Sequence, residues 1–265
     1  DYSEGVKTAY PQGVQAKEFI LPKELLEQDC VISLSKMKTH ALERITGAVK
    51  NSYGFIYGFH KAKGHTQYPS ADRFARMLID LNKCVAPKLY VMDGIVAMEG
   101  NGPGSGDPVP MNVLLMSTDP VALDSVFSRL VYLKPEMVPT NYHGEKMGLG
   151  TWKEEEITLL TPDGEISMAE AVKKYGNPAF NVDRTEVRKN IWTRMAGALN
   201  IFQKKPYIEA DKCVRCGICV QSCPVPGKAV DFRKGKGKPP VYDYRKCIRC
   251  FCCQEMCPKK AIKVK

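Results

Sequence analysis

The chain has 265 residues, a hydrophobic share of 44% and a formal net charge of +10. This composition is typical of a globular protein and excludes bulk disorder. No apolar run approaches the roughly 18 residues of a membrane-spanning helix, and the polar, partly acidic first ten residues exclude a secretory signal peptide. Because the chain does not begin with Met, we expect a processed product or an excised fragment.

Residues 1–162 alternate between predicted strands and predicted helices. The helices are a short one over 22–28, one over 71–85, and one that Thr118 or Asp119 caps and that has Pro120 in its first turn. The predicted strands cover residues 29–35, 87–100, 111–117 and 155–161. This alternation favours an α/β domain with a mostly parallel sheet.

Residues 163–206 are predicted to form a helical linker. An amphipathic helix over 184–202 is expected to pack between two domains, and a helix on a membrane surface is the alternative. The linker ends where the charge changes. Residues 207–265 hold 14 Lys and Arg against 5 Asp and Glu, whereas the rest of the chain holds 25 against 24. The basic character therefore belongs to a separate C-terminal domain.

This C-terminal domain contains an internal repeat. "KCVRCGICVQSCP" (212–224) aligns with "KCIRCFCCQEMCP" (246–258) at an offset of 34 residues. Each run reads C-x2-C-x2-C-x3-C-P, the spacing of bacterial two-cluster ferredoxins, in which the fourth Cys of each run binds the other cluster. Zinc is the main alternative, but zinc sites pair two C-x2-C knuckles across a longer gap. The spacing predicts two [4Fe–4S] clusters, one held by Cys213, Cys216, Cys219 and Cys257, the other by Cys247, Cys250, Cys253 and Cys223.

Three cysteines stand outside this pattern. Cys252 is expected to be a small apolar side chain beside its cluster, with a redox-active or alternative ligand as the other interpretation. Its neighbour Phe251 is expected to shield one face of the cluster from water. Cys30 and Cys84 lie in apolar stretches and are expected to be buried core thiols.

The basic residues of the tail fit anionic clusters. Each oxidised cluster with its four thiolates carries a charge of about −2, which neighbouring cations offset. After this charge is offset, the rest of the surface of the C-terminal domain should still be positive and should suit an acidic redox partner. Nucleic-acid binding is the other use of basic charge, but no recognition motif accompanies it. Metal-bound thiolates require a reducing compartment, so we expect the cytoplasm.

The large domain has a candidate anion site. Cationic and polar side chains follow the strand predicted over 29–35, where α/β folds bind ligands. These side chains are Lys36, Lys38, His40, Lys50 and Asn51. A glycine-rich loop at 100–106 could complete the pocket, although it matches neither a P-loop nor a dinucleotide fingerprint. The alternative is that both segments are solvated loops, and His60 and His65 are expected to be polar surface.

The segments "SKMKTH" (35–40), "GAVKN" (47–51), "DGIVAMEGNGP" (93–103) and "STDPVALD" (117–124) precede the cysteine runs in that order. Together they resemble the iron–sulfur proteins of domain-of-unknown-function family 362. The resemblance covers nearly the whole chain and implies a ferredoxin-like electron-transfer role without an established substrate. It also implies further strand–helix units upstream of residue 1, outside this sequence.

We therefore expect an α/β domain over 1–162, a helical linker over 163–206 and a two-[4Fe–4S] ferredoxin domain over 207–265. The predicted function is one-electron transfer through the clusters. In one hypothesis the protein is an oxidoreductase, or a component of one, with an anionic substrate between the Lys/His segment and the glycine-rich loop. In a second it is a non-catalytic redox adaptor that docks a partner enzyme. In a third it is an iron–sulfur protein that binds nucleic acid.

Overall fold

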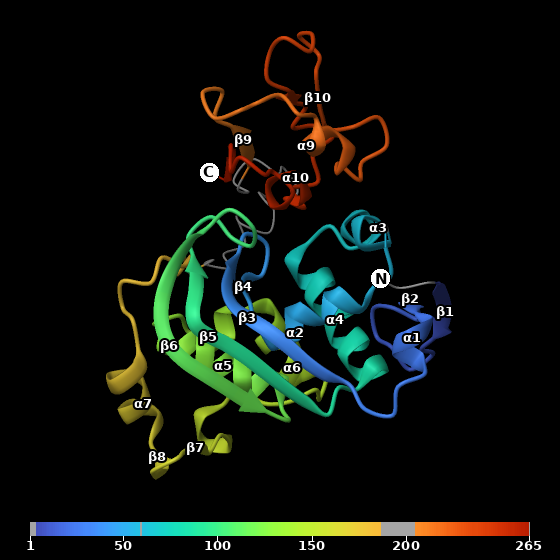
Figure 1. Ribbon diagram of the computed structural model, residues 1–265. Helices are drawn as coiled ribbons and strands as arrows, with labels where there is room; N and C mark the ends of the chain where they lie inside the picture. Colours follow the sequence, from blue (N-terminus) through green and yellow to red (C-terminus); the bar gives the residue numbers. More distant parts are fainter. Residues whose placement is uncertain (1–3, 59, 187–204, 265) are drawn as a thin grey trace, which may run out of the picture.

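The computed structural model describes residues 4–58, 60–186 and 205–264. A larger α/β part and a smaller cysteine-rich part lie against each other (Figure 1). The helix predicted over 184–202 lies almost entirely outside the described residues, so it stays a prediction, as does the linker. Among the residues that are described, no helix is long and apolar enough to cross a membrane.

Four strands form the central sheet, in the order β4 (Arg44–Thr46), β3 (Ile32–His40), β5 (Leu89–Glu99) and β6 (Asp107–Ser117). β3 and β5 are parallel, and the other two neighbouring pairs are antiparallel. The sheet is therefore mixed, and the prediction of a mostly parallel sheet is not confirmed. The cause is connection length, because β4 follows β3 after a short turn and β6 follows β5 after the glycine-rich loop. Helices intervene between β4 and β5.

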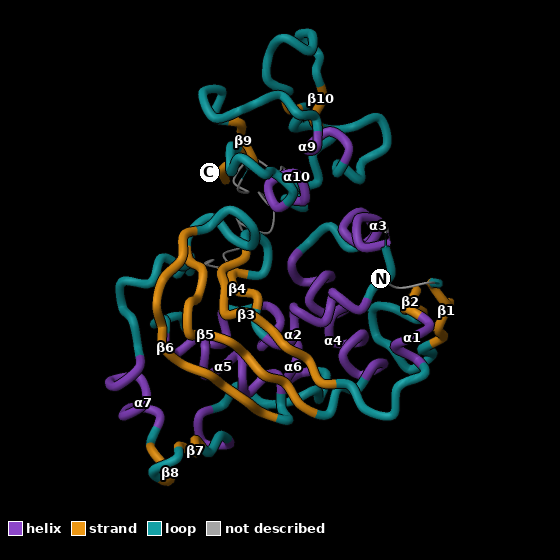
Figure 2. The backbone as a smooth tube through the Cα atoms, in the orientation of Figure 1, coloured by secondary structure: helices purple, strands orange, loops and turns teal. Residues whose placement is uncertain are grey.

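Helices lie on one side of this sheet (Figures 1 and 2). They are α2 (Ala48–Asn51), α4 (Ala71–Val85), α5 (Pro120–Leu130) and α6 (Pro139–Lys146). The helix predicted over 71–85 is confirmed, and the Ser70 side chain caps it by accepting the Arg73 N–H. Asp119, rather than Thr118, caps α5 and accepts two backbone N–H groups.

The sheet and these helices enclose the main hydrophobic core. Met37 of β3, Met92 of β5 and Phe127 of α5 are fully buried in it. Burying one side chain of this size contributes about 1.5–3 kcal/mol. Phe180 and Val182 also pack here, beyond the boundary predicted at residue 162.

The other face of the sheet is exposed in the described part of the chain. Alternate residues of the strands point there, so that Lys36 of β3 lies opposite Asp93 of β5, with 2.6 Å between Nζ and Oδ2. Large apolar side chains on this face are exposed at Ile32, Leu34, Ile95, Leu114 and Met116. A side chain on this face is therefore separated by the sheet from the helices.

A second core lies between α4 and the N-terminal segment. That segment comprises the antiparallel pair β1 (Gly5–Ala9) and β2 (Glu18–Pro22), and α1 (Lys23–Leu26). The 3-10 helix η1 (Ser52–Phe55) and α3 (His60–Gln67) complete this region. Cys84 is half-buried against this core, whereas Cys30 is exposed, so the prediction of a buried thiol is wrong for Cys30.

Short elements follow α5. They are η2 (Pro135–Met137), η3 (Glu154–Glu156), β7 (Leu159–Thr161), β8 (Gly164–Ile166) and α7 (Met168–Tyr175). The strand predicted over 155–161 is thus confirmed only in its last three residues, which pair with β8. Ser167 and Glu170 form a capping box at the start of α7.

The cysteine-rich part repeats one pattern twice. The antiparallel pairs β9 (Pro206–Ile208) with β12 (Ile262–Val264), and β10 (Val230–Asp231) with β11 (Val241–Tyr242), accompany two one-turn helices. These helices, α9 (Ile218–Gln221) and α10 (Cys252–Glu255), are separated by the same 34 residues as the cysteine runs. The α10 helix is the one that faces the α/β part (Figure 1).

Candidate functional site

Two cavities in the cysteine-rich part are each lined by four cysteines. The first cavity is lined by Cys213, Cys216, Cys219 and Cys257. The second cavity is lined by Cys223, Cys247, Cys250 and Cys253. Each set combines three cysteines of one run with the last cysteine of the other, so the chain crosses between the halves as the spacing predicts.

The backbone around both cavities is arranged alike. Arg215 and Gly217 before α9 have φ of 58° and 79°, and Arg249 and Phe251 before α10 have φ of 56° and 60°. A left-handed conformation costs a residue other than Gly about 1–2 kcal/mol. Gly217 takes this conformation without that cost, whereas the matching residue in the second half is Phe251. The buried ring of Phe251 lines the second cavity.

The chemistry of the cavities suits metal-bound thiolates. Burial, followed by the nearby Cys213 and Cys216, raises the pKa of Cys219 to about 11. Four thiolates can share such a site only when metal cations offset their charge. In the described residues, no three His, Cys, Asp or Glu side chains converge as ligands of one metal ion. The C-x2-C-x2-C spacing of the eight cysteines suits the corners of a cluster better than a single zinc ion.

The two cavities differ in exposure. In the first, Cys216 is exposed and the neighbouring Val214 is 53% exposed. In the second, Cys250 and Cys253 are buried, as is Phe251. The first cavity is therefore the one that lies near solvent, and the second lies close to the α/β part.

The glycine-rich loop holds the α10 helix. The buried Gln254 donates from Nε2 to the carbonyl oxygens of Asn101 and Gly102, at 2.8 and 2.9 Å. Lys260 donates to the Gly106 carbonyl at 2.8 Å. A Cβ on Gly104 would lie 2.8 Å from the Glu255 carbonyl oxygen, so only Gly allows this approach. The loop thus contacts the cysteine-rich part directly, where the sequence suggested a substrate.

Glu255, the last residue of α10, also contacts the α/β part. Its Oε1 lies 3.2 Å from Nε2 of His40, a side chain without solvent exposure. Nδ1 of His40 accepts the N–H groups of Leu42 and Glu43, so the imidazole proton is on Nε2 and is donated to Glu255. Burial and the charge of Lys50 lower the pKa of His40 to about 4, so this His is neutral at pH 7.

Glu255 is ionised in this contact. Burial acts to raise its pKa, but the hydrogen bond from His40 and the positive charge of Lys50 outweigh burial and lower it to about 2. An ionised carboxylate and neighbouring cations therefore lie between α10 and the strand–helix segment of the large domain.

Three of the five residues predicted as an anion site gather at this contact. Burial, followed by the charge of Lys50, lowers the pKa of Lys38, and the same charge acts on His40. Lys36 does not join them, because it lies on the exposed face of the sheet, paired with Asp93. Asn51 donates from Nδ2 to the Leu34 carbonyl at 3.1 Å. The five residues therefore do not form one site.

Sequence reasoning missed further residues at this contact. His65 is buried in α3, with its ring stacked on Phe74 at a centroid distance of 4.6 Å, so the prediction of polar surface is wrong for His65. Gln254 and Glu255 were also missed. The repeat contained a signal for them, since the first half has Val220 and Gln221 at the matching places.

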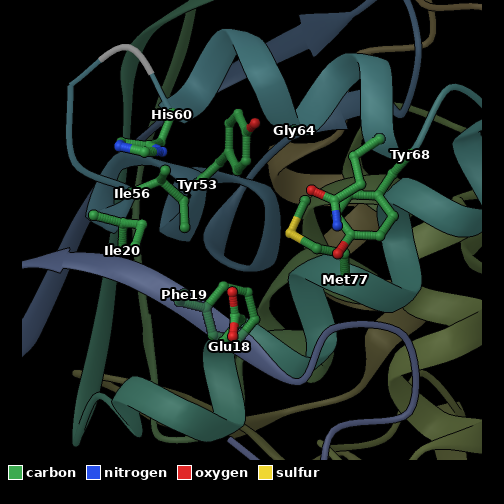
Figure 3. Close-up of a pocket in the computed structure, with 10 residues that line it drawn as sticks. Glu18, Phe19, Ile20, Tyr53, Ile56, His60, Gly64, Tyr68 and Met77 are labelled. Carbon is green, nitrogen blue, oxygen red and sulfur yellow. The ribbon is translucent and has the colours of Figure 1, made fainter. Parts of the chain in front are cut away.

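A separate pocket of about 160 Å³ opens beside the second core (Figure 3). Tyr53, Tyr68 and Met77 surround it with aromatic and apolar surface. None of the cysteines lines it. The Tyr53 ring packs edge-on against His65, which connects this region to the residues around Lys50.

Two family models match the chain. Residues 1–129 match the Domain of unknown function (DUF362), and residues 205–258 match a 4Fe-4S dicluster domain, so the predicted resemblance is confirmed. The chain is also similar to the Thylakoid-associated protein sll1697 of Synechocystis sp. (strain ATCC 27184 / PCC 6803 / Kazusa), with 42% identity over 130 residues. That match covers 49% of this chain and 40% of the relative, so the chain spans less than half of that protein.

Proposed function

We propose that this chain, which joins a DUF362 segment to a 4Fe-4S dicluster domain, transfers electrons between an external redox protein and the contact of its two parts. The observation that carries the proposal is the pair of cavities, each lined by four cysteines from both runs. We assign one [4Fe–4S] cluster to each set of four. When bound, such a cluster supplies a one-electron carrier.

The first cavity is the proposed entrance for electrons. Its exposed Cys216 lies beside Arg215 and Lys259, which are exposed and line the cavity. Arg215 also donates to the Gly237 carbonyl, and this places the exposed Lys236 and Lys238 nearby. A positive surface around an exposed cluster favours docking of an acidic redox protein. Free thiols in such numbers fit a reducing compartment such as the cytoplasm.

The second cavity faces the proposed destination. Lys38, His40 and Lys50 lie at the contact with α10, next to the run that contains Cys250 and Cys253. Both carboxylate oxygens of Glu43, which is fully buried, and Nδ1 of His65 make no hydrogen bond among the described residues. Burial raises the pKa of Glu43, which favours a protonated carboxyl that can donate a hydrogen bond near Lys50. A small anion there would gain charge-assisted hydrogen bonds of about 1.5–3 kcal/mol each.

Ligation is tested first. Protein purified without oxygen should contain about eight iron and eight sulfide per chain. Cys213→Ser and Cys257→Ser, although far apart in the sequence, should damage the same cluster, and Cys247→Ser should damage the other. Low-temperature EPR of the reduced protein distinguishes the two clusters. Spectra in which Cys213→Ser and Cys257→Ser affect different clusters would overturn the assignment.

Binding of an anion separates an oxidoreductase from a non-catalytic adaptor that only docks a partner. Phosphate or sulfate should raise the melting temperature of the holoprotein, and Lys38→Ala with Lys50→Ala should abolish the rise. Lys36→Ala is the matched control, because Lys36 is exposed and pairs with Asp93. An equal loss in the control, or no rise in the wild type, would favour the adaptor. Binding of DNA or RNA that weakens with salt would instead support the nucleic-acid hypothesis.

A further inference from the structure

Among the residues that the structure describes, the second cavity has a hydroxyl donor to sulfur with no counterpart in the first. Oη of Tyr242 in β11 lies 3.1 Å from Sγ of Cys253. A cysteine that binds a cluster is a thiolate without a proton, and a phenol keeps its proton up to a pKa of about 10, so Tyr242 is the donor. Stacking on the Tyr244 ring, with centroids 5.6 Å apart, holds the phenol in place. Tyr244 is held in turn by its hydrogen bond to the Pro206 carbonyl.

The internal repeat supplies the comparison. Position 208 corresponds to 242 at the offset of 34 residues, and there Ile208 lines the first cavity. Backbone N–H donors to a cysteine sulfur, in contrast, occur in both cavities. The Ala229 N–H lies 3.3 Å from Cys223 Sγ of the second set, and the Ala261 N–H lies 3.3 Å from Cys257 Sγ of the first. Tyr242 thus makes the two sulfur environments unequal.

A donor to a ligand sulfur stabilises the more negative, reduced state and raises the reduction potential. Cys250, Cys253 and Phe251 of the second cavity are buried, so water is excluded there. Exclusion of water by itself lowers the reduction potential of a cluster, and a hydrogen-bond donor would offset this effect. We propose that Tyr242 is a positioning residue that offsets this burial and keeps the second cluster reducible by the first. One electron moves between the clusters, and Tyr242 keeps its proton. The inference rests on the proposed function, since it requires a cluster in both cavities.

Tyr242→Phe tests the role of the phenol, because it keeps the ring and the stacking and removes the oxygen alone. In an anaerobic redox titration followed by EPR, the reduction equilibrium of one cluster should fall by about tenfold, which is 59 mV for one electron. The other cluster should not change. Tyr244→Phe is the control, since that hydroxyl bonds to a backbone carbonyl and not to sulfur.

The outcomes separate this inference from the proposed function. Wild-type protein with about half the expected iron would show that one of the two cavities is not a cluster site, and the proposed function would fail. Full iron with unchanged potentials in Tyr242→Phe would overturn the role of Tyr242 alone. If Tyr242→Phe loses iron, Tyr242→3-fluorotyrosine decides. Its more acidic phenol is a stronger donor, so a more positive potential supports the role and an unchanged potential overturns it.

Discussion

Gln254 should control how firmly the two parts of the protein hold together. Its side chain is fully buried, and Nε2 donates to two carbonyl oxygens of the glycine-rich loop. Gln254→Ala removes both hydrogen bonds and leaves the Gly102 carbonyl, which is buried, without that donor. Each bond contributes about 0.5–1.5 kcal/mol, and an unsatisfied buried group costs about 1–3 kcal/mol. The substitution should therefore weaken the contact by about 2–4 kcal/mol.

At 1.36 kcal/mol for each factor of ten, this loss corresponds to about a 30- to 1000-fold smaller docking equilibrium constant. Hydrogen exchange measured by mass spectrometry should show faster exchange in residues 100–106 and in α10, while iron content stays that of the wild type. Gln254→Glu should have a larger effect, because a carboxylate would then face two carbonyl oxygens.

Gln221→Ala is the control, since this exposed side chain lies in the corresponding helix of the first half. Exchange in the loop that rises less than about threefold in Gln254→Ala, with iron retained, would refute the reasoning, because about 2 kcal/mol predicts a larger change.

Three further substitutions test other parts of the structure. Cys252→Ala should leave iron content and the EPR spectrum unchanged and cost about 1 kcal/mol in thermal unfolding, whereas loss of about half the iron would make it a ligand. Asp124→Ala should cost about 3 kcal/mol in urea unfolding, because the Asp124 carboxyl accepts the N–H groups of Ala48 and Val49 at 2.5 and 3.1 Å, and an equally stable variant would contradict this. Burial lowers the pKa of His65 to about 4, so below pH 6.5 the unfolded chain takes up the proton first; the free energy of unfolding should fall by up to about 3 kcal/mol between pH 6.5 and 4. His65→Phe should remove this part of the acid sensitivity, and identical pH profiles would exclude it.

Local chemistry determined much of this protein from sequence alone. The apolar spacing and Ser70 specify α4, and Asp119 specifies the start of α5, because caps and periodicity act within a few residues. The cysteine spacing likewise determined which four cysteines line each cavity, since the repeat itself contains the crossing. In these cases the interacting groups are close in the chain or repeat at a constant offset.

Tertiary structure alone decided which residues of the large domain meet. Lys36 and Lys38 are two residues apart in β3, and the register of β3 against β5 shifts between them. Lys36 pairs with Asp93 on the exposed face, whereas Lys38 is partly buried and the charge of Lys50 acts on it. No local pattern signals such a shift, because it depends on how β5 pairs.

For the glycine-rich loop, too, sequence predicts one property and tertiary structure decides another. Four glycines between residues 100 and 106 indicate that a backbone approaches closely, and this is what the structure contains. The approaching group is the α10 helix, about 150 residues further along the chain, in contact through Gln254. Sequence predicts room for a contact because a missing Cβ is a local property. The identity of the partner follows from the packing of two distant parts, which burial and hydrogen bonding settle only after both have folded.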